Sequence, residues 1–265
     1  IQENEISDLI LAITGNMDSV MFQAILSAQE LGINLTTMSN AYEEILGRVP
    51  IYLLEADWVI RSFVEKAHTG SINRFLKRGL DLMGALVGVL IIAILLPFIG
   101  IAILIDSGLP IFYRQERLGR GGVPYTIFKF RTMHQNAEKE GEVRVTSQND
   151  ARITSVGRFL RKTHIDELPQ LINVLQGDMS LVGPRSERTE LVTYFQHELP
   201  FYRARLVVKP GITGWAQINF GYAETVEDTA TKLEYDLYYI EHRNIFMDIV
   251  ILVRTAGTVL GFKGR

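Results

Sequence analysis

Two adjacent carboxylates, Asp166 and Glu167, are the side chains whose type and spacing are best suited to chemistry in this sequence. They lie in the stretch RKTHIDELPQLINVLQGDMSLVGPR (residues 161–185), where Pro169 follows and a helically spaced apolar run extends to Gly177. Proline is tolerated only in the first turn of a helix, so the pair is predicted to lie at or just before a helix N-terminus. There the free N–H groups and the helix dipole favour negative charge.

The pair has two interpretations. One is plain capping of a helix, which is a common use of aspartate. The other is chemical, because two adjacent carboxylates can hold Mg²⁺, and the phosphates of a nucleotide can share that ion. Arg161 upstream and Arg185 downstream supply cations suited to an oligophosphate. The local residues leave both interpretations open.

A long apolar segment comes before these residues in the chain. From 82 to 105, 24 residues carry no charge, and as one straight helix they would measure about 36 Å, enough to cross a bilayer core. Pro97 lies inside the run, where it is expected to kink or break the helix. The two pieces would then be about 22 Å and 12 Å long, and each is too short to span.

Basic residues flank this segment on both sides: Arg74, Lys77 and Arg78 precede it, and Arg114, Arg117, Arg120, Lys129 and Arg131 follow it. Lysine and arginine concentrate on the cytoplasmic side of membrane segments, and a spanning helix would place one cluster outside. A re-entrant hairpin that turns at Pro97 keeps both clusters inside and is therefore favoured over a span. A buried core helix is a third and more remote alternative, because so long an uncharged run would need covering on every side.

The flanking regions predict mixed α/β structure. Residues 8–14 and 33–38 have strand character, and the helical pattern of 17–32 between them indicates a β-α-β unit with parallel strands. Residues 111–133 are typical of a β-hairpin that turns at the glycines after Arg120. The apolar residues 244–262 are expected to lie along a membrane surface or to pack on the rest of the protein.

Composition limits the remaining possibilities. The chain has 265 residues, a net charge of -3 and no cysteine, so disulfides and thiolate metal sites are excluded, and nothing in the charge favours nucleic acid. The five histidines show no i, i+4 pairing typical of a zinc site. Because the chain begins with Ile1 rather than Met, we expect it to be a piece of a longer protein.

Several sequence blocks resemble the bacterial sugar transferases, which are monotopic phosphoglycosyl transferases acting on polyprenyl phosphate. The blocks are RFLKRGLDLMGALVGVLIIAILLPF, YRQERLGRGGVPYTIFKFRTM, GRFLRKTHIDELPQLINVLQGDMSLVGPR, KPGITGWAQI and YDLYYI. The resemblance covers roughly residues 72–265. Residues 1–70 resemble the end of the Rossmann-like domain of the large members of that family.

The resemblance implies roles for individual residues. Asp166 and Glu167 match the catalytic dyad, with Asp166 as the nucleophile that attacks the β-phosphate of a UDP-sugar and expels UMP. Undecaprenyl phosphate would then attack the covalent phosphosugar-aspartate. Arg161 matches a phosphate-contacting arginine, and Pro184 with Arg185 matches the nucleotide-binding Pro-Arg.

The same resemblance implies a cofactor and a place in the cell. Mg²⁺ would be bound by Asp166 and Glu167, and Glu167 would help to hold the metal or manage the acceptor's proton. The partners would be a UDP-sugar, undecaprenyl phosphate and the lipid bilayer, without nucleic acid, and a homo-oligomer is possible. The protein would work on the cytoplasmic face of the bacterial inner membrane, at the first membrane step of O-antigen, capsule or exopolysaccharide synthesis.

These predictions combine into one architecture. A partial Rossmann-like β-α-β piece (1–70) is followed by a re-entrant membrane helix (71–110) and a mainly helical catalytic domain with a β-hairpin and membrane-interface helices (111–265). Two rival functions stay open. One is a membrane-anchored binding or regulatory module whose carboxylates only cap a helix, and the other is a Mg²⁺-dependent nucleotide-sugar hydrolase.

Overall fold

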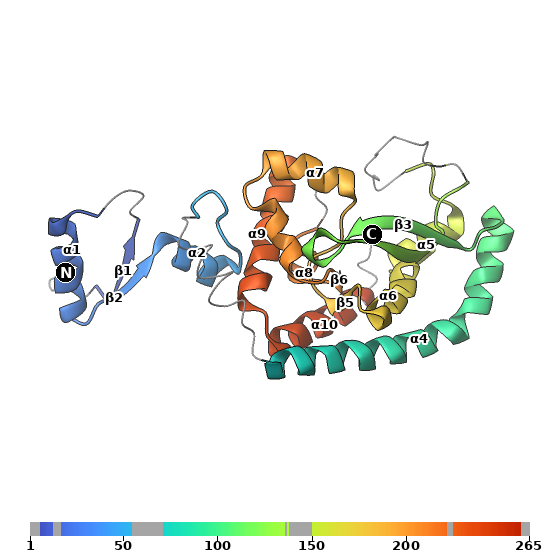
Figure 1. Cartoon of the computed structure of the whole chain (residues 1–265), viewed down its shortest axis with the longest axis horizontal. Coiled ribbons are helices and arrows are strands. Elements are labelled where there is room, and N and C mark those ends of the chain that lie inside the picture. The colour runs from blue at the N-terminus through green and yellow to red at the C-terminus, as the bar shows by residue number, and fades with distance from the viewer. Residues whose placement is uncertain are drawn as a thin grey trace.

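The computed structural model describes residues 6–12, 17–54, 71–135, 137, 150–221 and 225–260. A small α/β piece at the N-terminal end projects from a larger body, along which one long helix, α4, runs (Figure 1). The larger body contains the hydrophobic core and all of the predicted site residues that follow α4.

The N-terminal piece confirms the predicted β-α-β unit. Strands β1 (Asp8–Leu11) and β2 (Asn34–Thr37) pair in parallel, and α1 (Ser19–Glu30) connects them. Asp18 caps α1 by accepting a hydrogen bond of 2.7 Å from the backbone N–H of Met21. Helix α2 (Met38–Leu46) follows β2 directly. Two strands do not by themselves define a Rossmann-like domain, so that part of the assignment stays a prediction.

Helix α4 (Ser71–Ser107) contains the whole apolar segment in one helix of 37 residues, with Pro97 inside it. The predicted interruption is therefore not seen as a break in helical structure. Instead, α4 bends sharply toward its C-terminal end (Figure 1), and Pro97, which lacks an N–H donor, is a sufficient cause of such a bend. Among the described residues, α4 is the one helix long and apolar enough to cross a membrane.

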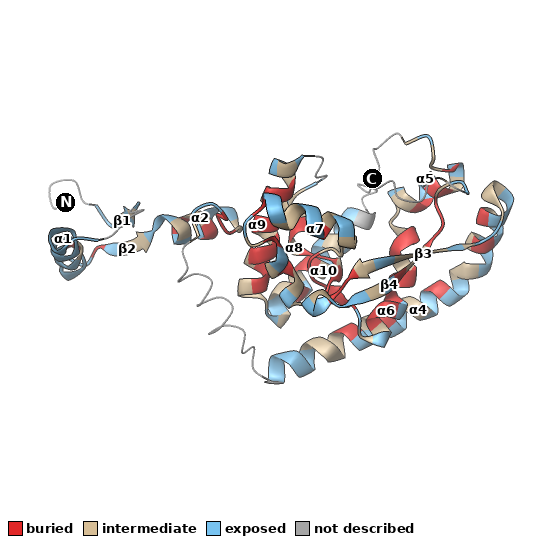
Figure 2. Ribbon diagram, turned by 45° about the horizontal axis from the view of Figure 1, so that its top comes forward, coloured by how far each residue is buried: buried red, intermediate tan, exposed pale blue. Residues whose placement is uncertain are grey.

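One side of α4 packs closely on the body through glycines. A Cβ at Gly88 would lie 2.4 Å from Cδ1 of Leu171, and one at Gly84 would lie 2.6 Å from Cδ1 of Leu181. These positions allow the helix backbone to approach elements of the body that a larger residue would hold away. The other side leaves large apolar side chains exposed, and Figure 2 shows few buried residues along α4.

Polar contacts hold both ends of α4 to the same body. Near its start, Asp81 accepts hydrogen bonds of 2.9 Å from Oγ of Ser180 and from the backbone N–H of Leu181. Near its end, Asp106 accepts a bond of 3.0 Å from the backbone N–H of Val156. The residues on either side of the uncharged segment 82–105 are therefore both attached to this body.

The body contains two small sheets and several short helices. The predicted hairpin is confirmed as β3 (Phe112–Leu118) and β4 (Pro124–Phe130), which pair antiparallel, and β5 (Ser180–Val182) pairs in parallel with β6 (Gly211–Thr213). The helices are η3 (Arg120–Gly122), α5 (Ser155–Lys162), η4 (Ile165–Gln170), α6 (Leu171–Gln176), α7 (Thr189–Glu198), η5 (Tyr202–Val207), α8 (Trp215–Asn219), α9 (Val226–His242) and α10 (Ile245–Leu260).

Candidate active site

The carboxylate pair lies in the first turn of η4, which leads directly into α6. This confirms the predicted position at a helix start, although Pro169 falls within η4 rather than in α6. His164 before the pair adopts a left-handed conformation with φ of 56°, which reverses the chain between α5 and η4. Asp166 and Glu167 are both buried, with 7% and 8% of their surface exposed. The pair is therefore enclosed by protein rather than presented as an ordinary surface cap.

Glu167 is held by two cations. Its Oε1 accepts a hydrogen bond of 2.8 Å from Nζ of Lys129, and its Oε2 accepts one of 3.0 Å from Nη1 of Arg185. Nη2 of Arg185 also donates to Oε1, which completes a bidentate pair. Burial alone would raise the pKa of Glu167, but Arg185 and Lys129 outweigh it and hold the pKa well below its ordinary value. Glu167 is therefore a fixed anion with both oxygens engaged.

Asp166 lies in different surroundings. Its carboxylate has no hydrogen-bond partner among the residues that the structure describes. Burial, and secondly the negative charge of Glu167, raise the pKa of Asp166 to about 6, while the charges of Lys129, Arg161 and Arg185 limit the rise. A carboxyl with a pKa near 6 is still roughly nine-tenths ionised at pH 7. Asp166 thus offers an anionic oxygen that no donor from the described part of the chain occupies.

Arg161 reaches this site from α5. Its positive charge is close enough to lower the pKa of Asp166, and its Nε donates a hydrogen bond of 2.9 Å to Oγ1 of Thr132. Gly157 allows α5 to pack on the chain after β4, because a Cβ there would lie only 2.1 Å from the carbonyl oxygen of Thr132. The position of Arg161 is therefore determined by close backbone packing as well as by its own hydrogen bond.

Pro184 and Arg185 follow β5, and Arg185 reaches Glu167 of the dyad from there. The backbone N–H of Gly211 donates a bond of 2.9 Å to the carbonyl of Pro184, and the N–H of Gly183 donates one of 2.9 Å to the carbonyl of Thr213. A small hollow lies beside Pro184 and Arg185. Its walls also include Leu118, Gly119, Ser186, Glu187, Val192, Arg205, Leu206, Val208 and Pro210.

The structure brings together most of the predicted site residues and adds two that sequence reasoning missed. In the sequence Lys129 stood out only as one of the basic residues that follow the apolar segment, and in the structure it is an ion-pair partner of Glu167. Asn173 is fully buried; its Nδ2 donates 2.8 Å to the carbonyl of Thr126, and its Oδ1 accepts 3.3 Å from the N–H of Phe128. Asn173 thereby ties α6 to β4, the strand that carries Lys129. The only sequence signal for Asn173 was a polar residue within an apolar run.

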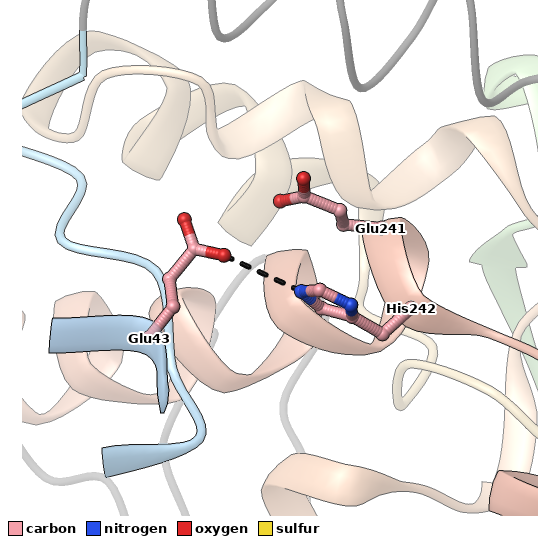
Figure 3. A group of neighbouring side chains, drawn as sticks. All are labelled: Glu43, Glu241 and His242. Carbon is pink, nitrogen blue, oxygen red and sulfur yellow. Dashed lines mark hydrogen bonds and ion pairs between the residues drawn. The ribbon is translucent and has the colours of Figure 1, made fainter. Parts of the chain in front are cut away.

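The donor set fits a magnesium site in part. Magnesium is bound by one or two carboxylates together with substrate phosphates and water, and the unpaired carboxylate of Asp166 suits that pattern. Glu167 fits less well as a direct ligand, because Lys129 and Arg185 already occupy both of its oxygens. A separate group of possible metal ligands, Glu43, Glu241 and His242, lies between α2 and α9, where Nε2 of His242 is 3.3 Å from Oε2 of Glu43 (Figure 3).

Comparison with known proteins identifies the class to which this fold and site belong. Residues 72–262 match the family described as bacterial sugar transferase. The chain therefore belongs to the bacterial sugar transferase family, as the sequence blocks predicted. The match begins within α4 and includes every candidate site residue named above from Pro97 to Arg185.

Characterised relatives act on different sugars. The UDP-N-acetylgalactosamine-undecaprenyl-phosphate N-acetylgalactosaminephosphotransferase of Aeromonas hydrophila is 43% identical over 195 residues, 73% of this chain and 46% of that protein. The UDP-glucose:undecaprenyl-phosphate glucose-1-phosphate transferase of Escherichia coli (strain K12) is 42% identical over 195 residues, 73% of this chain and 41% of that protein. The undecaprenyl-phosphate galactose phosphotransferase of Salmonella typhimurium is 36% identical over 206 residues, 72% of this chain and 42% of that protein. The chain thus spans less than half the length of these relatives.

Proposed function

We propose that this chain transfers a sugar 1-phosphate from a UDP-sugar to undecaprenyl phosphate. The observation that carries the proposal is the state of Asp166, a buried carboxylate with no hydrogen-bond partner among the described residues and with three cationic side chains around it. Such a group is suited to attack an anionic phosphate, because the cations offset the repulsion between the two. The names of the relatives support the choice of substrates.

The reaction proceeds in two displacements at one phosphorus atom. An oxygen of Asp166 attacks the β-phosphorus of the UDP-sugar, the bond between that phosphorus and the bridging oxygen breaks, and UMP leaves with the bonding pair. A phosphate oxygen of undecaprenyl phosphate then attacks the same phosphorus and releases the aspartate carboxylate. The products are UMP and a diphosphate-linked sugar lipid. Because the donor is aqueous and the acceptor is a lipid, successive use of one site predicts ping-pong kinetics.

The cations have separate tasks in this scheme. Arg161 lies on the Asp166 side and would hold the transferred phosphate, whereas Arg185 and Pro184 would hold the nucleotide. Lys129 and Arg185 keep Glu167 ionised, so Glu167 contributes a fixed negative charge that favours a bound cation. Mg²⁺, when bound by Asp166 and the substrate phosphates, would supply a Lewis acid for the developing charge.

The contacts of α4 support a re-entrant placement, and the basic residues on both flanks of its apolar segment favour the cytoplasmic face of the inner membrane. Asp81 near one end and Asp106 near the other both bind the catalytic body. A straight span would place one of these ends on the far side of the bilayer, away from its partner. A bent helix that enters and leaves by the same surface satisfies both contacts and leaves its exposed apolar side to lipid.

The test is release of UMP by the purified full chain in lipid or detergent. We expect release from a UDP-sugar when Mg²⁺ and undecaprenyl phosphate are present, and transient labelling of the protein by β-³²P donor. Asp166→Asn should lower the rate by at least about a thousandfold and abolish the label, since the amide is not a nucleophile. Glu190→Gln, an exposed carboxylate in α7, is the matched control and should stay active.

Two results would reject parts of this function. Full activity of the Asp166→Asn variant would remove Asp166 as the nucleophile. Release of UMP and free sugar phosphate without any labelled protein would instead indicate a hydrolase that uses water directly. A panel of UDP-sugars in the same assay identifies the donor, because the relatives named above use N-acetylgalactosamine, glucose and galactose.

A further inference from the structure

The segment after α2 packs into the catalytic body, although α4 separates the two in the sequence. Val49 and Ile51 are almost fully buried and belong to the same hydrophobic core as the side chains around the active site. Gly47 ends α2 in a left-handed conformation with φ of 62°, which directs the following residues onto the body. We call residues 42–51, which comprise the end of α2 and the segment that follows it, the latch.

The latch contacts α8 through Trp215. The indole Nε1–H of Trp215 donates a hydrogen bond of 2.7 Å to the carbonyl of Gly47. A Cβ at Gly47 would lie 3.4 Å from the indole ring, so the glycine backbone packs directly on it. On α9, Tyr238 stacks on the same indole, with 5.9 Å between ring centroids. Trp215 is therefore held between the latch and α9.

The latch also contacts α9 at several points. Glu234 accepts a hydrogen bond of 3.2 Å from the hydroxyl of Tyr42 and lies 3.4 Å from Nε of Arg48. Its backbone carbonyl accepts a bond of 3.1 Å from the N–H of Val49. Glu43 forms the contact with His242 at the end of α9 that is drawn in Figure 3. Together these contacts fix α9 along about two turns.

The two helices that the latch contacts, α8 and α9, also help to position Arg185. Trp215 directly follows Gly214, whose backbone lies so close to Gly183 that a Cβ would be 2.2 Å from the Gly183 carbonyl oxygen. Gly183 precedes Pro184 and Arg185, and Arg185 forms a β-bridge with Gly211. A shift of α8 therefore moves the backbone of the Pro184–Arg185 turn, because no space separates them.

A second route runs through α9. Asp236, two residues after Glu234, binds the buried side chain of Arg205 at 2.7 Å, and Nη2 of Arg205 donates 3.0 Å to the carbonyl of Arg185. Arg205 has only 4% of its side chain exposed, so this ion pair is shielded from water. The latch contacts at Glu234 and the ion pair that holds Arg205 are thus made by neighbouring residues of α9, and Arg205 in turn contacts Arg185.

We propose that the latch is a positioning element of the transferase site, which sets the nucleotide-binding Arg185 through α8 and α9. Trp215 and Tyr42 are its positioning residues. The inference rests on the proposed function, since it assumes that Arg185 holds the nucleotide. It makes the affinity for the donor depend on a segment continuous with the N-terminal α/β piece, so events in that piece can alter donor binding.

The experiment compares the full chain with the Tyr42→Phe/Trp215→Phe double variant, which removes two hydrogen-bond donors and leaves one aromatic six-membered ring at each position. We expect the KM for the UDP-sugar to rise about three- to tenfold, the change that one or two neutral hydrogen bonds support. The KM for undecaprenyl phosphate should stay unchanged. Tyr52→Phe, which removes the hydroxyl of an exposed tyrosine just after the latch, is the control and should match wild type.

Calorimetric titration with UMP gives a reading that does not need turnover. A weaker UMP affinity in the double variant, by the same factor as the KM change, supports the proposal. Unchanged UMP affinity, or an equal loss in the kinetics of both substrates, would overturn it and leave the latch a purely structural contact. A wild-type chain that binds UMP but releases none from UDP-sugars would refute the proposed function instead, while the titration still decides the role of the latch.

Discussion

Asp166 and Glu167 are neighbours in sequence, yet their surroundings give them opposite properties. Two cations fix Glu167 as an anion and hold its pKa well below the ordinary value, whereas burial raises the pKa of Asp166 to about 6. Pairs of carboxyl groups with separated pKa values are typical of sites in which the two groups have different roles. The carboxylate of Asp166 has no hydrogen-bond partner among the described residues, whereas that of Glu167 is held in an ion pair with Lys129 and Arg185.

Lys129 gives the residue-scale prediction. Lys129→Met would leave Glu167 buried beside Arg185 alone, and breaking a buried ion pair from one side costs about 3–5 kcal/mol. We expect a lower melting temperature and a fall in kcat of at least about tenfold, because Asp166 loses a nearby cation. Lys162→Met, at an exposed lysine of α5, is the control. Wild-type stability and kcat in the Lys129 variant would contradict the role given to this pair.

At the scale of elements, close backbone packing positions the site. Gly84 and Gly88 allow α4 to lie against Leu181 and Leu171, and Leu171 is the residue that follows η4. Gly157 likewise allows α5 to lie against the backbone of the chain after β4. The dyad is therefore supported on two sides by helices that approach more closely than side chains would allow. Helix α4, which is long and apolar enough to cross a membrane, is one of these supports.

Two glycines of α4 test this packing. Gly88→Ala places a Cβ within 2.4 Å of Leu171 and should destabilise the protein by about 1–3 kcal/mol as the core adjusts. Gly79→Ala adds the same methyl group where no atom lies within 4 Å, so it should be neutral or should stabilise the helix by up to about 1 kcal/mol. Denaturant unfolding in detergent measures both. Equal stabilities for the two variants would show that α4 does not pack as described.

At the scale of the whole molecule, one body carries the active site, both ends of α4 and the latch. The exposed apolar side of α4 and the exposed side chains of α10, such as Phe246 and Val253, offer surface to lipid outside that body. Since Asp81 and Asp106 attach α4 to the body on both sides of its uncharged segment, the re-entrant placement proposed above predicts that the candidate site and both ends of that segment lie on one side of the bilayer. In the proposed function, this arrangement would let an aqueous donor and a lipid acceptor reach the same carboxylate.

Cysteine labelling tests this topology, and the chain has no cysteine to give background. Ile72→Cys marks the start of α4, and Val123→Cys marks the hairpin between β3 and β4; both side chains are exposed. A maleimide that cannot cross the membrane should reach neither position in intact spheroplasts and both in inverted vesicles. A periplasmic cysteine protein in the same cells is the control. Labelling at position 72 from outside would establish a span.

The sequence by itself determined the features that depend on neighbouring residues. Pro169 predicts a helix start at the dyad and Gly177 ends α6, the glycines after Arg120 mark the hairpin, and Pro97 is a sufficient cause of a bend in α4, because turns, caps and proline effects act over a few residues. The family blocks predicted that the dyad is a catalytic site, which stays a prediction, whereas the β-α-β pattern predicted the parallel pair at the N-terminus, which the structure confirms.

Only the tertiary structure decided the contacts between distant residues. Lys129 meets Glu167 across 38 positions, and Trp215 meets Gly47 across 168, so no local pattern could indicate either contact. The same holds for the different states of Asp166 and Glu167, which depend on burial and on charges brought from β4, α5 and the turn after β5. Local rules place a side chain on its element, whereas its ionisation and its partners follow from how the elements pack.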